Sequence, residues 1–135
     1  MSALSAYLEG KVANYILGRV AYTAPTTVYL ALYTAAPSEA GGGTEVSGTG
    51  YVRASVANTV SNFPDAVLGV KSNGIAITFP VVSDPSGWGN VTHWGMFDEL
   101  SGGNLLFYGA LAPVTLINHN DQLIIPSGDL DITFE

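Results

Sequence analysis

The chain has 135 residues, no cysteine, and a formal net charge of −7 from 11 acidic and 4 basic side chains. This length predicts one domain with its own core, and the lack of cysteine excludes disulfides and thiolate metal sites. Nucleic acid is not an expected partner, because binding it needs a basic surface and no Lys or Arg follows Lys71. No apolar run reaches the roughly 20 residues of a membrane span, and no signal peptide is recognisable, so we expect a cytosolic product without membrane contact.

Residues 3–17 carry the one convincing helical period of the sequence. The stripe consists of Leu4, Tyr7, Leu8, Val12, Tyr15 and Ile16, which recur at steps of three and four residues. Ser2 is the expected N-cap, and Gly18 is the expected residue just beyond the C-cap. The pattern leaves open whether the stripe is buried on the chain's own sheet or on a neighbouring subunit, and the own sheet is the first expectation.

The segment from Val28 to Tyr33 is apolar on both faces, which predicts a strand buried on both sides or facing a second protein. It is followed by residues 34–50, a Gly-rich stretch without apolar periodicity. Such a length is uncommon within a compact domain unless the loop has a task. We therefore predict an arm that orders against a partner, with a mobile surface loop as the equal alternative. Its expected contact residues are Glu39, Glu45 and Val46.

The central feature of the sequence is a predicted hairpin from Val91 to Ala112, with its turn at 101–104. Trp94 and Met96 fall on one face of the first strand. Gly95 and Gly109 lie in the middle of the two arms, where a missing side chain indicates close approach by a bulky neighbour such as Trp94 or Phe97.

Further strands are expected where apolar residues alternate between turn signals, and the stretch 59–74 is less regular. These strands are Tyr51–Val56, Ile75–Phe79, Val114–Ile117, Gln122–Ile125 and Leu130–Phe134. The resulting prediction is a mainly β chain, an antiparallel β-sandwich or jelly-roll-like barrel with one N-terminal helix, covering residues 1–135 as a single domain.

The sequence contains none of the common catalytic motifs, so no catalytic, cofactor or metal site is expected. His93 and His119 are the two candidates for a metal ligand or a neutral-pH base, and structural or exposed roles are the expectation for both. Asp129 and Asp131 have the spacing of a carboxylate pair on one strand face, as glycoside hydrolysis would need, but a solvated strand face is the simpler interpretation.

Two segments carry a resemblance to a known family: GGGTEVSGTGYVR at 41–53 and GGNLLFYGAL at 102–111. Together with the order of the remaining features, they resemble small virion structural proteins of tailed bacteriophages. Members of that family are labelled tail fibre protein or capsid cement (decoration) protein. The resemblance implies a β-rich, non-enzymatic building block of the particle, made in the cytoplasm of the host bacterium.

The first functional expectation from the resemblance is a capsid cement protein, a dimer or trimer on the capsid surface that bridges subunits of the major capsid protein. The alternative is a tail or tail-fibre component, which could stack host glycans on Trp88, Trp94 or Tyr108. A hydrolase fragment that uses Asp129 and Asp131 is the third hypothesis. The residues expected to contact partners are Glu39, Glu45, Val46, Tyr7 and Tyr15.

Overall fold

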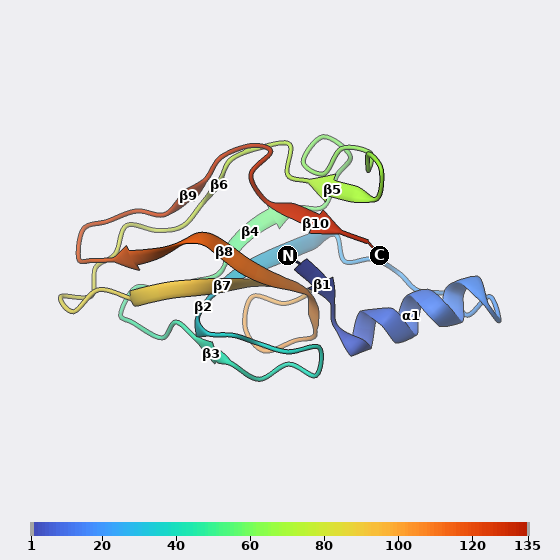
Figure 1. The fold of residues 1–135 in the computed structure, drawn as a ribbon, viewed down its shortest axis with the longest axis horizontal. Helices are drawn as coiled ribbons and strands as arrows, with labels where there is room; N and C mark the ends of the chain where they lie inside the picture. Colours follow the sequence, from blue (N-terminus) through green and yellow to red (C-terminus); the bar gives the residue numbers. More distant parts are fainter. Residues whose placement is uncertain (1, 135) are drawn as a thin grey trace.

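A computed structural model describes residues 2–134 of the chain, and its largest element is an antiparallel six-stranded sheet. The strand order is β1 (Ser2–Leu4), β8 (Leu105–Ile117), β7 (Gly89–Phe97), β2 (Thr27–Ala35) and β3 (Thr44–Glu45), and β4 (Ala54–Ala57) also pairs with β2. The long strands β2, β7 and β8 form the middle of this sheet (Figure 1).

Two short strand pairs form a second layer over one face of the sheet (Figure 1). They are β5 (Val70–Ser72) with β10 (Asp131–Thr133), and β6 (Ile77–Thr78) with β9 (Ile124–Ile125). Side chains of both layers meet in one core, where Ile77 and Ile132 of the second layer join Leu30 of the main sheet. This arrangement confirms the mainly β, antiparallel sandwich with a single helix among residues 2–134.

The opposite face of the main sheet carries a smaller apolar cluster, formed by Ala31, Tyr33, Phe97 and Leu105. Strand β2 therefore buries side chains on both faces, Leu30 and Leu32 toward the main core and Ala31 and Tyr33 toward this cluster. The prediction for Val28–Tyr33 is confirmed in its first form, a strand buried on both sides.

The predicted hairpin is formed by β7 and β8. Trp94 pairs with Gly109, and a Cβ atom at Gly109 would lie 2.9 Å from Cζ2 of the Trp94 ring. This distance is too short for a real contact, so the glycine makes room for the indole, as predicted. At the turn, the Asp98 carboxylate accepts a hydrogen bond of 2.7 Å from the backbone N–H of Asn104.

The N-terminal helix α1 spans Ala6–Ile16 and begins later than expected. The expected Ser2 N-cap is wrong, because Ser2 belongs to β1 and pairs with Gly109 of β8. Ser5 is the N-cap instead, and its side chain accepts from the N–H of Leu8. Gly18 follows the C-cap Leu17 with φ +112°, which confirms the predicted end of the helix.

The expected burial of the helical stripe on the chain's own sheet is wrong. Within α1 only Leu8 is buried, because the helix continues from the edge strand β1 and projects away from the sandwich (Figure 1). The later stripe residues Val12, Tyr15 and Ile16 are exposed. No helix among residues 2–134 has the length and apolar character needed to cross a bilayer.

Candidate docking surface

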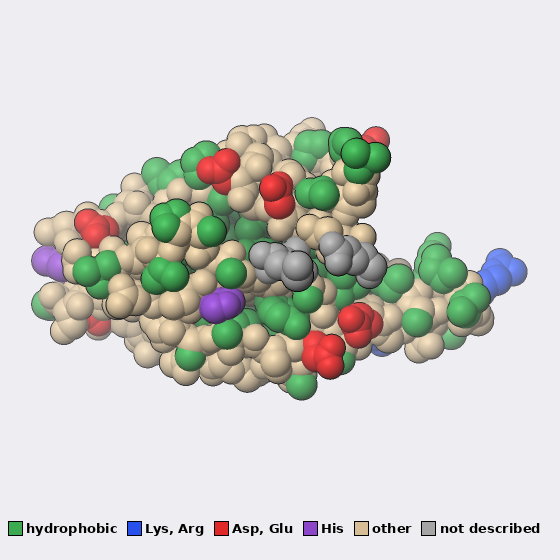
Figure 2. All heavy atoms as spheres, viewed as in Figure 1, with side chains coloured by type: hydrophobic (Ala, Val, Ile, Leu, Met, Phe, Trp, Pro, Cys, Tyr) green, Lys and Arg blue, Asp and Glu red, His purple; other side chains and the backbone are tan. Residues whose placement is uncertain are grey.

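A surface of exposed apolar side chains lies on α1 and on the segment 17–26 that returns from it. Ile16 is 66% and Leu17 81% exposed, and Val20 is also open to solvent. The returning chain is held against the helix by a hydrogen bond of 2.9 Å from the N–H of Val20 to the carbonyl of Asn14. Figure 2 shows apolar side chains along this projection and a Lys or Arg side chain at its tip.

The root of α1 is fixed to the sandwich by backbone groups. The N–H of Ser5 donates to the carbonyl of Leu106, and the Ser5 hydroxyl donates to the carbonyl of Leu105. The N–H of Ala6, one of the helix donors without an intrahelical partner, donates to the carbonyl of Glu39 at 2.8 Å. The direction of α1 is therefore set by the sheet and by the Gly-rich segment.

An apolar pocket of about 210 Å³ opens at this root. It lies between the start of α1, the main sheet and the C-terminal strand, and Asn58 and Lys71 are its polar lining residues. Leu8 is buried and lines the pocket, and the exposed residues Val12 and Ile16 follow it at four-residue steps on the same face of α1. The apolar walls are formed by Leu8, Tyr22, Ala24, Pro25, Val28, Phe63, Met96, Leu106, Phe107, Ile132 and Phe134.

The charges around this surface are of both signs. Lys11 lies 5.3 Å from the centre of the Tyr7 ring on α1, in cation–π geometry. Burial, and after it the charges of Tyr7 and Asp98, raise the pKa of Tyr22, which lines the pocket. The charged residue that lines the pocket is the cation Lys71, and Lys11 places a second cation on the helix.

The Gly-rich segment lies along the edge of the main sheet. Ser38 and Gly41 exchange backbone hydrogen bonds of 2.8 Å, and β3 pairs with the end of β2. Gly43 has φ +74°, and a Cβ atom there would lie 2.7 Å from the carbonyl oxygen of Ala35. The glycines are therefore required by a tight turn that brings Thr44 and Glu45 back to β2.

The predicted contact residues fall into two groups in the structure. Val46 is 5% exposed and belongs to the core, and Glu45 forms an ion pair with Arg53. Glu39, Tyr7 and Tyr15 are exposed on or beside α1. Partner contact by these five residues stays a prediction, and the structure brings three of them to the projecting side of the molecule.

Arg53 is the structural residue that sequence analysis missed. Its guanidinium binds both carboxylate oxygens of Glu45 at 2.9 Å and donates to the carbonyls of Glu99 and Gly102. The Arg53 Cζ atom also lies 3.8 Å from the centre of the Phe97 ring. The signal in the sequence was weak: one Arg between apolar neighbours in a chain with only 4 cations.

The aromatic glycan platform of the tail-fibre alternative is not formed by the two tryptophans. Trp88 is 5% and Trp94 3% exposed, so neither offers an open ring face, and the proposal that they stack sugars is wrong. Trp88 packs edge-on against Tyr51 with ring centres 5.3 Å apart. Tyr108 is half-buried beside the smaller apolar cluster.

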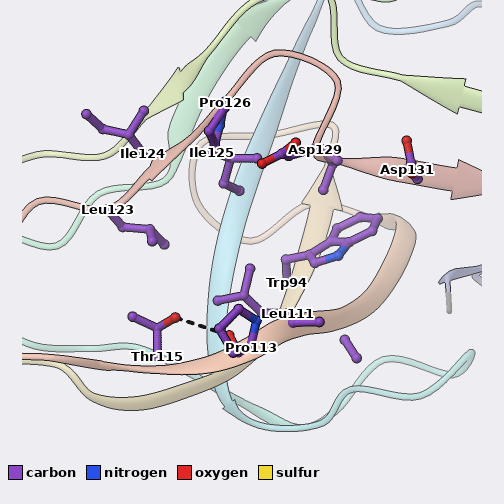
Figure 3. Close-up of a pocket in the computed structure, with 13 residues that line it drawn as sticks. Trp94, Leu111, Pro113, Thr115, Leu123, Ile124, Ile125, Pro126, Asp129 and Asp131 are labelled. Atoms are coloured by element: carbon purple, nitrogen blue, oxygen red, sulfur yellow. Dashed lines mark hydrogen bonds between the residues drawn. The ribbon is translucent and has the colours of Figure 1, made fainter.

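A second cavity of about 350 Å³ lies between β8 and the segment 123–131, with Trp94 in its wall (Figure 3). Asp129 and Asp131 line it, but Asp131 accepts a hydrogen bond from the Ser72 hydroxyl on the neighbouring strand. In Figure 3 the Asp131 carboxylate points away from Trp94, and the two carboxylates are not aimed at a common centre. The geometry gives no support to the hydrolase hypothesis.

The two histidines lie apart on the molecule (Figure 2). His93 is in β7, where its Nδ1 lies 2.8 Å from the Thr92 hydroxyl, and His119 is in the exposed turn after β8. Among residues 2–134, no group of three or more His, Cys, Asp or Glu side chains is placed to hold a metal ion.

Comparison with known proteins identifies the family of this chain. A search of curated proteins gives no match. A family model described as "Podophage GP4 fiber I protein gp80" matches residues 3–133, which is nearly the whole chain. The matched range includes α1, both layers of the sandwich and the Arg53 cluster. The chain therefore belongs to the family of Podophage GP4 fiber I protein gp80 and is a bacteriophage virion structural protein.

Proposed function

We propose that this protein is a non-enzymatic subunit of a phage fibre, and that it works by binding neighbouring subunits through α1. The observation that carries the proposal is the position of α1, which is rooted firmly in the sheet but presents its apolar stripe to solvent. Exposed apolar side chains that lie together on one projection are typical of a surface that binds another protein.

The energetic scale supports an attachment role for the helix. Full burial of one large aliphatic side chain contributes about 1.5–3 kcal/mol relative to leaving it in water. Val12, Ile16 and Leu17 are each at least 42% exposed and lie on one projection. Their burial against another subunit would thus contribute several kcal/mol, without any change in the sandwich.

The description of the matching family as a fibre protein supports the fibre location. Capsid cement is the second candidate, and the shape of the subunit favours it. The described chain is a compact sandwich with one short helix and forms no elongated shaft (Figure 1), as suits a protein that sits across junctions of the major capsid protein. Trp88 and Trp94 are buried and offer no open ring face on which a glycan could stack.

Quantitative mass spectrometry of purified particles tests the proposal. A fibre subunit is expected at a few copies for each appendage, and antibody labelling should place it on a fibre. Hundreds of copies, in fixed proportion to the major capsid protein, would overturn the fibre location and support cement. Absence from purified particles would contradict both candidates.

A further inference from the structure

We propose that the β8–β9 fork is a docking groove for an extended, basic segment of a different virion protein. The fork is the cavity of about 350 Å³ between residues 110–115 of β8 and residues 123–126 (Figure 3). None of its lining residues belongs to α1. The proposal therefore does not rest on attachment through the helix, and it applies to a subunit on a fibre and to one on the capsid.

The first observation is that two unpaired strand edges lie on the two sides of this cavity. Among residues 2–134, β1 pairs with β8 only at residues 107–109, and β9 pairs only with β6. In Figure 3, Leu111 and Pro113 lie on one side of the cavity and Leu123 and Ile125 on the other. An unpaired edge presents backbone N–H and C=O groups to an extended chain that lies beside it.

The edge of β8 is not regular along its whole length. The register of β7 and β8 shifts between Val91 and His93, opposite residues 110–115 of β8. Pro113 has no N–H group to donate. Bulges and prolines limit how far another strand can extend along an edge. We therefore expect the bound segment to pair over a few residues only and to be held mainly through its side chains.

The fork offers an apolar surface to those side chains. Trp94 and Leu130, each 3% exposed, lie in its wall and connect it to the core. Leu111 and Leu123 are half-buried, and Ile124 is 48% exposed although it lines the cavity. Apolar side chains of a partner segment would thus find apolar neighbours on both sides of the fork.

The charged groups of the fork are carboxylates. Asp129 and Asp131 line it, and Asp131 accepts a hydrogen bond from the Ser72 hydroxyl, whereas Asp129 is exposed. Residues 72–135 include all the lining residues and contain seven acidic and no basic side chains, while residues 1–71 contain four of each. A Lys or Arg side chain of the partner segment would therefore meet opposite charge at Asp129.

The partner is a different protein because none of the four cations of this chain lies in an extended segment that is free to bind. Lys11 is in α1, and Arg19 has φ +55° in the turn after the helix. The Arg53 side chain is 7% exposed, and Lys71 is in β5, where it pairs with Ile132. A second copy would have to give up part of its fold to supply a basic extended segment.

Photocrosslinking in purified phage particles tests the proposal. Benzoylphenylalanine replaces Ile124 in the fork or, as the control, Val52 in the segment between β3 and β4; both native side chains are 48% exposed. The probe at position 124 should crosslink to a Lys- or Arg-containing segment of another virion protein, identified by mass spectrometry, and the probe at position 52 should not reach that segment. No crosslink from position 124, or crosslinks only to another copy of this chain or to segments without Lys and Arg, would overturn the proposal.

A charge reversal tests whether Asp129 recognises the segment. With the probe at position 124, Asp129→Lys should lower the crosslink yield per incorporated copy at least about tenfold, because like charges then oppose each other. Glu99→Lys makes the same change at an exposed residue of the β7–β8 turn and should leave the yield unchanged. Equal yields in these two variants would contradict the role of Asp129.

A synthetic peptide with the sequence of the crosslinked segment gives a measurement that does not depend on particle assembly. The peptide should bind the purified protein, and replacing its Lys and Arg residues by Glu should raise the dissociation constant at least about tenfold. Asp129→Lys in the protein should have a similar effect, and Glu99→Lys should have none. Equal affinities of the two peptides would overturn the proposal, whereas the fibre location is tested separately by the copy number in particles.

Discussion

At the scale of single residues, Arg53 connects parts of the chain that are far apart in sequence. Its guanidinium joins Glu45 of β3 to the carbonyls of Glu99 and Gly102 in the β7–β8 turn, and it covers the ring of Phe97. The Arg53 side chain is 7% exposed and that of Glu45 27%. A planar group with donors on several sides suits this position, whereas an ammonium group would satisfy only part of it.

We therefore expect Arg53→Lys to lower the free energy of unfolding by about 1–3 kcal/mol, measured by urea denaturation. The loss comes from the carbonyl bonds and the ring contact that Lys cannot reproduce together. Arg19→Lys, at an exposed position, is the control and should change stability by less than about 0.5 kcal/mol. An equally small change for Arg53→Lys would show that the contacts of Arg53 with Glu45, the two carbonyls and the Phe97 ring contribute little to the free energy of unfolding.

The raised pKa of the buried Tyr51 side chain leads us to expect that the free energy of unfolding falls at alkaline pH. Its hydroxyl donates to Glu45 and accepts from the N–H of Leu32, and burial raises its pKa far above 10.0. Burial, and after it the charge of Glu45, also raises the pKa of Tyr33 to about 12. Both groups stay protonated in the folded chain while the unfolded chain ionises, so stability is complete below pH 10 and is lost as pH rises above it.

Tyr51→Phe should flatten this alkaline loss by up to about 1.4 kcal/mol per pH unit, in unfolding measurements between pH 8 and pH 11.5. The variant will start from a lower stability at neutral pH, because the hydrogen bonds to Glu45 and Leu32 are gone. Tyr15→Phe, on the exposed helix, is the control. The same alkaline slope in Tyr51→Phe as in the parent would contradict this account.

At the scale of elements, the Gly-rich segment is a part of the sheet edge. Val46 lies in the core, and the N–H of Val46 donates to the carbonyl of Leu32. We expect Val46→Ala to lower the free energy of unfolding by about 2 kcal/mol, because two buried methyl groups are lost and a small cavity remains. Val52→Ala, at a half-exposed residue in the next segment, should cost less than about 0.5 kcal/mol.

Thermal or urea unfolding of the two alanine variants distinguishes an edge strand from a loose tether. Equal stabilities would mean that Val46 contributes no more than an exposed valine, which would favour the mobile loop of the sequence analysis. The expected difference would show that Val46 holds the segment to the sheet as part of the core.

Elements with a local pattern were predictable, and those that depend on distant contacts were not. The hairpin around Trp94 and Gly109 follows from alternation and glycine placement, and the two-faced burial of β2 follows from its continuous apolar run. The direction of α1 depends on the pairing of Ser2 with Gly109 and on the Glu39 carbonyl, which no local pattern reveals.

The same reason explains what could be predicted of the candidate site. The apolar stripe of α1 was visible in the sequence, since Leu8, Val12 and Ile16 recur with a helical period. Its pocket was not, because the walls come from α1, the main sheet and the C-terminal strand, including Phe63, Phe107 and Phe134. A site assembled from segments so far apart needs the fold before it can be seen.

At the scale of the whole molecule, the chain separates into two parts of different character. A sandwich with most of the acidic residues has a buried core between its layers, and a short projection carries Lys11, Arg19 and the exposed apolar stripe. Figure 2 shows this division, with the projection standing clear of the body. The sandwich has its own buried core, but the apolar side chains of α1 remain exposed in the single chain. Such exposed apolar side chains are expected of a virion subunit that binds neighbouring proteins.

The central claim is that α1 is covered in the assembled particle, and thiol labelling tests it most directly. Phage carrying Val12→Cys, in a chain otherwise free of cysteine, would be treated with a maleimide before and after denaturation of the particles. The account predicts that the Val12→Cys thiol reacts at least about tenfold more slowly in intact particles than in the denatured chain. An equal rate in intact and denatured particles would show that α1 stays open to solvent and would contradict the claim.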